Sequence, residues 1–361
     1  MARVNERRRA RLAAALTSAE LDGVLVSHLL NVRYLTGFTG SAGHVLVGAD
    51  GSCVLATDAR YELQAADESP DVEVVITRRG LSQLATHALD AGWSRVGFED
   101  LHLTVADWTA LVEHGDDGRW RPCGRLVEEL RVVKDDVELD ALRRACAISD
   151  AALAAVLPQI VPGVTERQVG RWIDDGLRVD GSDGPGFDTI VAAGAWGAVP
   201  HHQPSDYPIA EGDLVTIDFG ARVDGYHADM TRTLLAGGTP DAWQAEVYAL
   251  VQAAQAVGVA ALSSTSTPAV VDAAARQVIV DGGMGEYFTH GLGHGVGLQI
   301  HEAPFLGSSS TDKLGVSVPV TVEPGIYVPG RGGVRIEDTV VVHADHVERL
   351  TTTTRDLIEL G

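Results

Sequence analysis

The sequence contains few cysteines and no long apolar run, and both absences limit what the protein can be. Three cysteines occur among 361 residues, at positions 53, 123 and 146, and none belongs to a CxxC pair. A zinc site built from thiolates is therefore not expected, and isolated free thiols fit a reducing cytosol. No stretch of 18 apolar residues is present, and residues 12–16 are too short for the apolar core of a signal peptide. The sequence thus predicts a cytoplasmic protein without a membrane span.

Positively charged residues are also scarce. Lysine and arginine number 28 against 50 aspartates and glutamates, which gives a formal net charge of −22 at pH 7. Such an excess of negative charge argues against nucleic acid or an anionic membrane as a partner, and it favours solubility. An apolar content of 45% in a chain of this length predicts two domains, each with a large hydrophobic core.

Several common site motifs are absent as well. The glycines at 291, 293, 295 and 297 do not follow the GxGxxG spacing of dinucleotide-binding proteins, and there is no P-loop. The His301-Glu302 pair lacks the second histidine of a zincin helix, and Gly-Ser-Ala-Gly at 40–43 is one residue short of a nucleophile elbow. Dinucleotide binding and covalent serine chemistry therefore have little support.

The first third of the chain alternates strand and helix patterns, which predicts an α/β domain over residues 1–131. The Gly-punctuated segment 31–41 is expected to be a loop. The expected helices are 1–22, 60–67, 80–91 and 104–114, and the expected strands are 22–27, 44–48, 52–56 and 72–76.

The remaining residues, 132–361, are expected to form an α+β domain in which helices alternate with antiparallel hairpins. Asp135 with Glu138 resembles a capping box at the start of the first helix, and Thr165 with Gln168 resembles a second. The Thr-Pro pairs at 239–240 and 267–268 are expected to start two more helices. A helix followed by a hairpin occurs twice, over 135–233 and 240–340, which suggests an internal duplication.

The stretch 213–233 reads as a hairpin that brings two acidic side chains together. If residues 222–225 form its loop, Asp218 lies directly opposite Asp229 on the returning strand. Opposite residues in an antiparallel pair share a face, with Cβ atoms roughly 5 Å apart. Two like charges at that distance are destabilising unless a positive charge lies between them, and a divalent cation is the simplest candidate.

A second hairpin, residues 323–337, is symmetric about Gly330. A loop of residues 329–331 places Glu323 opposite Glu337, and the segment between the two hairpins holds His294 flanked by two glycines. A single carboxylate on a strand is usually solvated and a single histidine is usually a core residue, but this combination predicts two divalent ions that share bridging oxygens. The oxygen-rich ligand set favours manganese, with zinc, cobalt or iron as alternatives. The predicted ligands are Asp218, Asp229, His294, Glu323 and Glu337.

These motifs resemble the signature blocks of the proline-specific metallopeptidases, Xaa-Pro aminopeptidase (aminopeptidase P) and Xaa-Pro dipeptidase (prolidase). The resemblance covers nearly the whole chain. It rests on residues 218–233 (Asp-Phe-Gly-Ala to Thr-Arg-Thr), 290–298 (His-Gly-Leu-Gly-His-Gly-Val-Gly-Leu), 323–327 (Glu-Pro-Gly-Ile-Tyr) and 333–338 (Gly-Val-Arg-Ile-Glu-Asp). Residues 31–40 and 57–61 are similar to the family's N-terminal domain, 130–134 to its junction and 200–203 to its substrate-side histidine block.

The resemblance implies an α+β pita-bread catalytic domain, 132–361, preceded by an α/β creatinase-like N-terminal domain, 1–131, and it implies a homodimer. It assigns metal ligation to the five residues named above, with Asp229 and Glu337 bridging the two ions. A creatinase shares the fold but works without metal and would not be expected to keep all five. Methionine aminopeptidase shares the catalytic half but lacks such an N-terminal domain.

The same resemblance implies hydrolysis of small peptides with proline in the second position. Glu323 would act as general base or orient the attacking hydroxide, while His201 and His301 would stabilise the intermediate and protonate the leaving nitrogen. Arg335 would support them. Of the adjacent histidines only one can face the cleft, and the resemblance selects His201, with His202 at the surface or behind the site.

Three questions stay open at the level of sequence. His290 and His301 either face the substrate or make structural hydrogen bonds. The motifs do not separate aminopeptidase P from prolidase, because both need the same ligands. The alternatives to an Xaa-Pro peptidase are an inactive pita-bread module that binds peptides or proteins, and a hydrolase of the same fold that acts on a non-peptide C–N bond.

Overall fold

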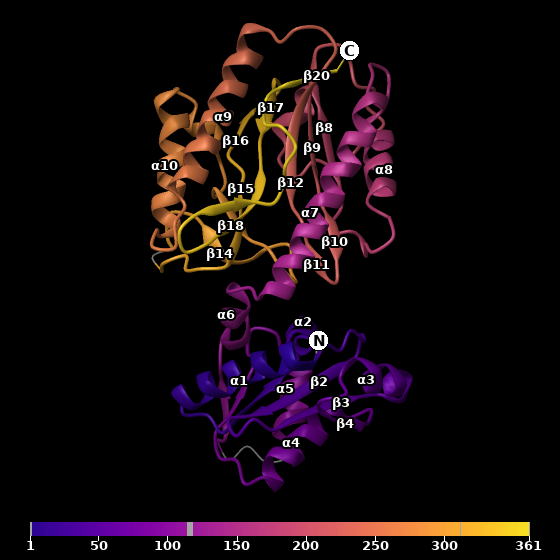
Figure 1. Ribbon diagram of the computed structural model, residues 1–361, viewed down its shortest axis with the longest axis vertical. Coiled ribbons are helices and arrows are strands. Elements are labelled where there is room, and N and C mark those ends of the chain that lie inside the picture. Colours follow the sequence, from indigo (N-terminus) through magenta and orange to yellow (C-terminus); the bar gives the residue numbers. More distant parts are fainter. Residues whose placement is uncertain (1, 114–117, 311, 361) are drawn as a thin grey trace. The chain divides into compact units, whose positions relative to one another are not determined.

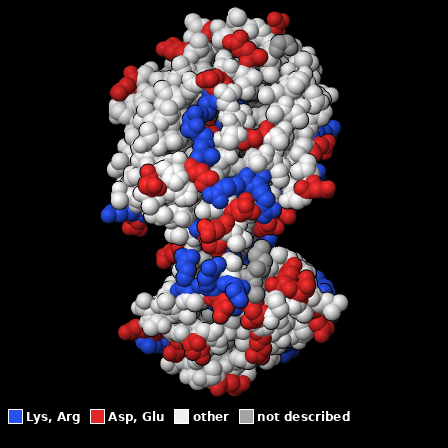
Figure 2. Space-filling model, viewed as in Figure 1, with Lys and Arg blue, Asp and Glu red and all other residues white. Residues whose placement is uncertain are grey.

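The computed structural model describes residues 2–113, 118–310 and 312–360, and the chain divides into two compact units (Figure 1). The first unit ends at Arg131 and the second begins at Val132. Among the described residues, no helix is both long and apolar enough to cross a membrane. On the face drawn in Figure 2, acidic side chains are scattered over the surface with basic ones among them.

The first unit is built on a six-stranded mixed sheet with helices packed against it. The strand order is β4 (Glu73–Ile76), β3 (Cys53–Thr57), β2 (Gly43–Gly48), β1 (Gly23–Val26), β5 (Val96–Phe98) and β6 (Trp120–Pro122). β2 is antiparallel to both of its neighbours, and the other pairs are parallel. The helices of this unit are α1 (Ala2–Ser18), α2 (Leu29–Thr36), α3 (Glu62–Glu68), α4 (Gly80–Asp90) and α5 (Val105–Val112). This is the α/β arrangement that the alternating pattern predicts.

One local prediction for this unit is wrong, and two strands are not predicted at all. The expected loop 31–41 begins as helix α2, which buries Val32, Tyr34 and Leu35. Gly37 ends that helix in the left-handed region, at φ 85°, so this glycine marks a helix C-terminus and not a loop interior. Strands β5 and β6 were not expected from the sequence. Each has only three residues, which is too short to show an alternating pattern.

The second unit places strands between two pairs of helices, as Figure 1 shows. Helices α7 (Asp136–Val156) and α8 (Glu166–Gly176) form one pair, and α9 (Ala242–Ala261) and α10 (Pro268–Asp281) form the other. The short α6 (Leu126–Val132) belongs to the first unit except for its last residue. The capping boxes of α7 and α8 and the Thr267 cap of α10 are confirmed. Helix α9 begins later than expected, because Asp241 and not Thr239 caps it and Gln244 completes the box.

The strands of this unit form several sheets. One sheet has the order β20 (Ile358–Leu360), β12 (Met230–Ala236), β9 (Asp213–Phe219) and β8 (Ile190–Ala193). Another has the order β14 (Glu302–Leu306), β13 (Gly293–Gly295), β15 (Val318–Val322), β18 (Asp338–Val342) and β19 (Val347–Arg349). Smaller sheets join β11 (Tyr226–His227), β10 (Ala221–Val223) and β7 (Gly184–Pro185), and β16 (Gly325–Val328) with β17 (Gly332–Arg335). Helices α9 and α10 share a buried core with β15 and β18.

The register of the first acidic hairpin differs from the prediction. Asp218 of β9 lies opposite Thr231 of β12, so the expected direct pairing with Asp229 is wrong. The reason is the turn: Val223 pairs with Tyr226, which leaves a two-residue loop whose residues, Asp224 and Gly225, both have positive φ. A shift by two residues keeps every side chain on its expected face, because side chains alternate with a period of two.

The second acidic hairpin has the expected register. Gly325 pairs with Arg335 and the loop between β16 and β17 is residues 329–331. The same register pairs Val322 of β15 with Asp338 of β18. Glu323 and Glu337 therefore lie opposite each other, at the point where the chain leaves one sheet for the other.

Candidate active site

The nine residues singled out from the sequence all line one cavity of about 630 Å³ in the second unit. Its wall draws on β9, β13, β14 and β16, on the end of β17 and on the segment after β8. These segments lie far apart in the sequence and meet only because the sheets fold against one another. The nine are His201, Asp218, Asp229, His290, His294, His301, Glu323, Arg335 and Glu337.

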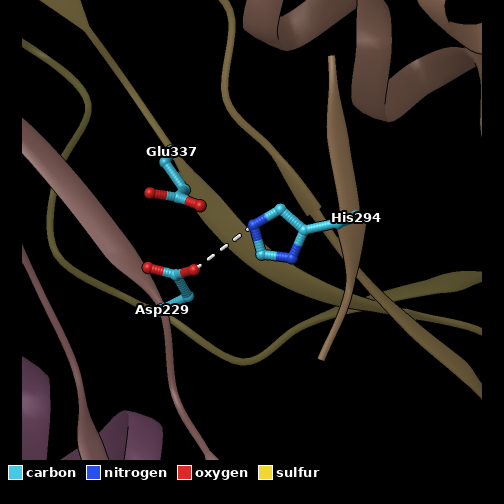
Figure 3. Close-up of side chains that lie close together, drawn as sticks. All are labelled: Asp229, His294 and Glu337. Carbon is cyan, nitrogen blue, oxygen red and sulfur yellow. Dashed lines mark ion pairs between the residues drawn. The ribbon is translucent and has the colours of Figure 1, made fainter. Parts of the chain in front are cut away.

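Three of them form a compact group with the composition of a metal site. One ligand atom each from Asp229, His294 and Glu337 lies within 4.8 Å of the others, and all three residues are buried. Figure 3 shows the two carboxylates and the imidazole directed at a common point, with 3.6 Å between His294 Nε2 and Asp229 Oδ2. Two carboxylates and an imidazole suit a borderline divalent ion.

The other two predicted ligands flank this group. Glu323 Oε1 lies 3.1 Å from His294 Nε2, and it accepts a hydrogen bond from Thr321 Oγ1. Asp218 Oδ2 accepts a hydrogen bond of 2.8 Å from Arg335. The second oxygen of Asp218 and Oε1 of Glu337 are both buried, and neither has a hydrogen-bond partner among the described residues. An unpaired buried carboxylate oxygen is costly, and coordination of a cation would satisfy it.

The pKa values of the site carboxylates also indicate that the site suits a cation. Burial raises the pKa of Asp229 and of Glu337 well above the usual range, and neighbouring carboxylates raise both further. Burial also raises the pKa of Asp218, although Arg335 opposes the change. Carboxylates crowded in a buried space hold protons unless a positive charge compensates them. The residues present therefore fit divalent cations.

Two residues that the sequence does not single out, Thr231 and Tyr327, support the site. Thr231 donates a hydrogen bond of 2.6 Å to Glu337 Oε2 and accepts one from Arg335 Nε. Tyr327 accepts a hydrogen bond from Arg335 and contacts Nε2 of His290. Both could be predicted from the alternation of side chains along a strand, in which residues separated by an even number share a face. Thr231 is two residues from Asp229, and Tyr327 is four from Glu323.

The histidines have distinct surroundings. The His301 ring lies 4.4 Å from the His294 ring, centre to centre. His290 uses both ring nitrogens, one with Gly291 O and one with Tyr327 Oη. His201 is on the cavity wall, whereas His202 is buried and bonded to Glu166. Of the two places expected for His202, the surface is excluded and the place behind the site fits, because the buried carboxylate of Glu166 holds its ring inside the protein.

The chain matches known families over most of its length. Residues 140–344 match the model of metallopeptidase family M24, and residues 8–133 match the creatinase/prolidase N-terminal domain. An uncharacterized peptidase of Bacillus subtilis is 38% identical over 94% of this chain and 96% of its own.

Two solved structures are similar throughout. The Xaa-Pro dipeptidase from Bacillus anthracis has a TM-score of 0.94 at 39% identity and covers 99% of this chain and 100% of its own. The X-Pro aminopeptidase from Thermotoga maritima has a TM-score of 0.88 at 32% identity and covers 96% of this chain and 99% of its own. The predicted pita-bread domain behind a creatinase-like domain is thereby confirmed. The chain belongs to metallopeptidase family M24 and is a metal-dependent peptidase with a creatinase/prolidase N-terminal domain.

Proposed function

We propose that this peptidase hydrolyses the Xaa-Pro bond of small peptides that carry proline in the second position. The observation that carries the proposal is the group of four carboxylates and His294 at the wall of a cavity that has room for a short peptide. Asp229, Glu337 and His294 are buried, and two carboxylate oxygens of the group have no hydrogen-bond partner among the described residues. Similar proteins are described as Xaa-Pro dipeptidases or an X-Pro aminopeptidase, which supports the substrate class.

We propose that the cavity holds two divalent ions, most simply manganese, because four of the five ligands offer oxygen. Asp229 and Glu337 would bind both ions, and Asp218, His294 and Glu323 would each bind only one of them. Ions held in this way supply a water of lowered pKa and polarise the scissile carbonyl.

The chain's own residues would carry the proton transfers. Glu323, fixed by Thr321 and facing the cavity, is the proposed general base. His201 and His301 also line the cavity without belonging to the five ligands, which suits them to stabilise the intermediate and to protonate the proline nitrogen. The hydrogen bonds of His290 and Arg335 to Tyr327 suit both to shape the substrate side of the cavity.

Proline imposes a requirement on the cavity wall. Its nitrogen is part of a tertiary amide and has no N–H, so a cleft that depends on that group has nothing to bind. The ring must be recognised by shape, and the cavity offers apolar side chains for this purpose. They are Phe187, Ile190, Pro200, Ile300, Phe305 and Leu306.

The proposal is tested by measuring hydrolysis of Ala-Pro, Ala-Pro-Ala and the matched Ala-Ala peptides, with metal analysis of the purified protein. We expect cleavage before proline only, loss of activity on chelation and recovery with Mn²⁺. Preference for Ala-Pro would indicate a prolidase, and preference for Ala-Pro-Ala an aminopeptidase P. No cleavage of any peptide by metal-loaded protein would overturn the proposal in favour of a peptide-binding module or of non-peptide C–N hydrolysis.

A further inference from the structure

The side chain of Glu166 is a carboxylate that is fully buried outside the cavity. Glu166 is the first residue of α8, and no part of its side chain is exposed. It accepts four hydrogen bonds. Oε1 accepts from Ala193 N at 2.8 Å; Oε2 accepts from His202 Nε2 at 2.8 Å, from Ser205 N at 2.9 Å and from Ser205 Oγ at 2.6 Å.

These four bonds hold both ends of one segment that reaches the active site. Ala193 is the last residue of β8, and Ser205 lies just beyond the histidine pair. The segment between them contributes Pro200, His201 and Gln203 to the cavity wall. The middle of the segment is fixed as well, because His202 is bonded to Glu166 and stacks on Trp196 with ring centres 5.1 Å apart and planes 18° from parallel.

An ionised carboxylate is suited to this task in a way that other side chains are not. It only accepts hydrogen bonds, and its two oxygens have room for about four of them. Charge-assisted bonds are also shorter and stronger than neutral ones. Burying a charge costs free energy that an apolar side chain would not cost, so we attribute to this carboxylate the definition of one conformation and not a gain in stability.

We propose that Glu166 is a positioning residue for His201. It fixes the conformation of residues 193–205 through His202 and Ser205, and thereby holds the His201 imidazole at the cavity wall. The inference rests on the proposed function in one respect, which is that His201 acts on the bound peptide. Glu166 itself is not among the residues that line the cavity, and none of its hydrogen-bond partners named above is a proposed metal ligand.

The first test is Glu166→Gln, which keeps the size of the side chain but turns one acceptor into a donor that faces other donors. We expect kcat on an Xaa-Pro peptide to fall by about 10- to 100-fold, as for a displaced catalytic group, with KM and metal content near wild type. The matched control is Glu99→Gln. Glu99 is also buried and also accepts four hydrogen bonds, from Ser27 N and Oγ, His28 N and Asn31 Nδ2, but it lies in the first unit. We expect a comparable loss of thermal stability and an unchanged kcat.

A double-mutant cycle separates positioning from general destabilisation. If Glu166 acts through His201, Glu166→Gln will have little further effect on kcat in a His201→Ala background. Equal effects of Glu166→Gln in both backgrounds would overturn the proposal. If Glu166→Gln does not fold, His202→Phe replaces it, since the ring still stacks on Trp196 while the bond to Glu166 is lost; the same non-additivity is expected.

A crystal structure of Glu166→Gln tests the inference without relying on turnover. Displacement of residues 199–204 with the metal-site carboxylates unmoved is the expected result, and an unmoved His201 would refute the proposal. Two other results would contradict the proposed function and not the positioning role. In the first, wild-type protein cleaves no Xaa-Pro peptide. In the second, His201→Ala is fully active although Glu166→Gln still displaces the segment.

Discussion

Two buried oxygens, Asp218 Oδ1 and Glu337 Oε1, distinguish this site from an ordinary network of hydrogen-bonded acids, because neither has a hydrogen-bond partner in the part of the chain that the structure describes. The other oxygen of each residue is already engaged, by Arg335 and by Thr231. Each carboxylate therefore turns one oxygen to protein donors and leaves one for a cation. Supporting groups of this kind orient metal ligands and fix the direction of the free lone pairs.

The bridging assignment predicts unequal effects of ligand removal. Asp229→Ala and Glu337→Ala should each reduce bound metal to well under half of wild type, because a bridging carboxylate serves both ions. Asp218→Ala removes a ligand of one ion and should leave more metal bound. Metal content per chain, measured by elemental analysis after the same dialysis, checks this. Equal losses in all three variants would refute the bridging assignment.

The two cavity histidines should affect rate and not metal content. His201→Ala and His301→Ala are each expected to lower kcat by about 100-fold, the usual scale for lost acid–base or oxyanion assistance. Bound metal should stay near wild type, since neither residue is among the five ligands. If His301→Ala lost metal together with activity, His301 would itself be a ligand. Its metal content should be measured because the His301 ring lies only 4.4 Å from the ring of His294.

At the scale of single elements, the alternation of side chains along a strand and the residues that form turns predict most of the hairpin structure. The loop at 329–331 and the cross-strand placement of Glu323 and Glu337 follow from the sequence, because a hairpin register is fixed by its turn. The predicted register of the first hairpin differs from the structure by two residues, because Asp224 and Gly225 alone form the turn. A shift of two leaves each side chain on its predicted face, so the pattern still identifies the site residues.

The role of Glu166 and the presence of β5 and β6 cannot be predicted from the local sequence. Glu166 opens α8 behind the Thr165 cap and reads as an ordinary acidic residue in a first helical turn. Its four hydrogen bonds come from three residues, Ala193 at the end of β8 and His202 and Ser205 beyond it, so only the folded chain shows its role. The three-residue strands β5 and β6 owe their place to pairing with β1 and with each other, which no short pattern encodes.

The glycine before His294 should not tolerate a side chain. A Cβ on Gly293 would lie 2.2 Å from Thr321 O, a backbone atom of the adjacent strand β15. Gly293→Ala must therefore push β13 away from β15 and displace His294, and we expect lower thermal stability together with weaker metal binding. Gly170→Ala in α8 is the control, because its Cβ would meet Pro204 at an ordinary 3.6 Å. That variant should be at least as stable as wild type, since alanine favours helix. Wild-type metal content in Gly293→Ala would contradict the argument.

At the scale of the whole molecule, the site belongs to one unit only. All five proposed ligands lie beyond Val132, and the first unit contributes none of them. The cavity could be anticipated only as a set of motifs, because its walls come from strands that are distant in sequence.

We propose that the protein is a homodimer, as its resemblance to family members with a creatinase-like domain suggests. Light scattering coupled to size exclusion at micromolar concentration should give twice the chain mass of 38.1 kDa. The net charge of −22 makes the ionic strength important, because repulsion between like-charged chains is screened by salt. A mass of one chain at 0.15 M salt would exclude a stable dimer.

Metal should stabilise the two units unequally. A ligand that binds the folded state alone raises the free energy of unfolding by about 2.7 kcal/mol at 100 times its Kd. For a domain of 150–250 residues, 1 kcal/mol shifts Tm by about 2–4 °C, so saturating Mn²⁺ should raise the transition of the second unit by about 5–10 °C. The first unit holds none of the ligands, and its transition should move little. If calorimetry resolves only one transition, the Glu337→Ala variant decides, because its Tm should respond weakly to Mn²⁺. An equal response in that variant would mean that the ion binds elsewhere.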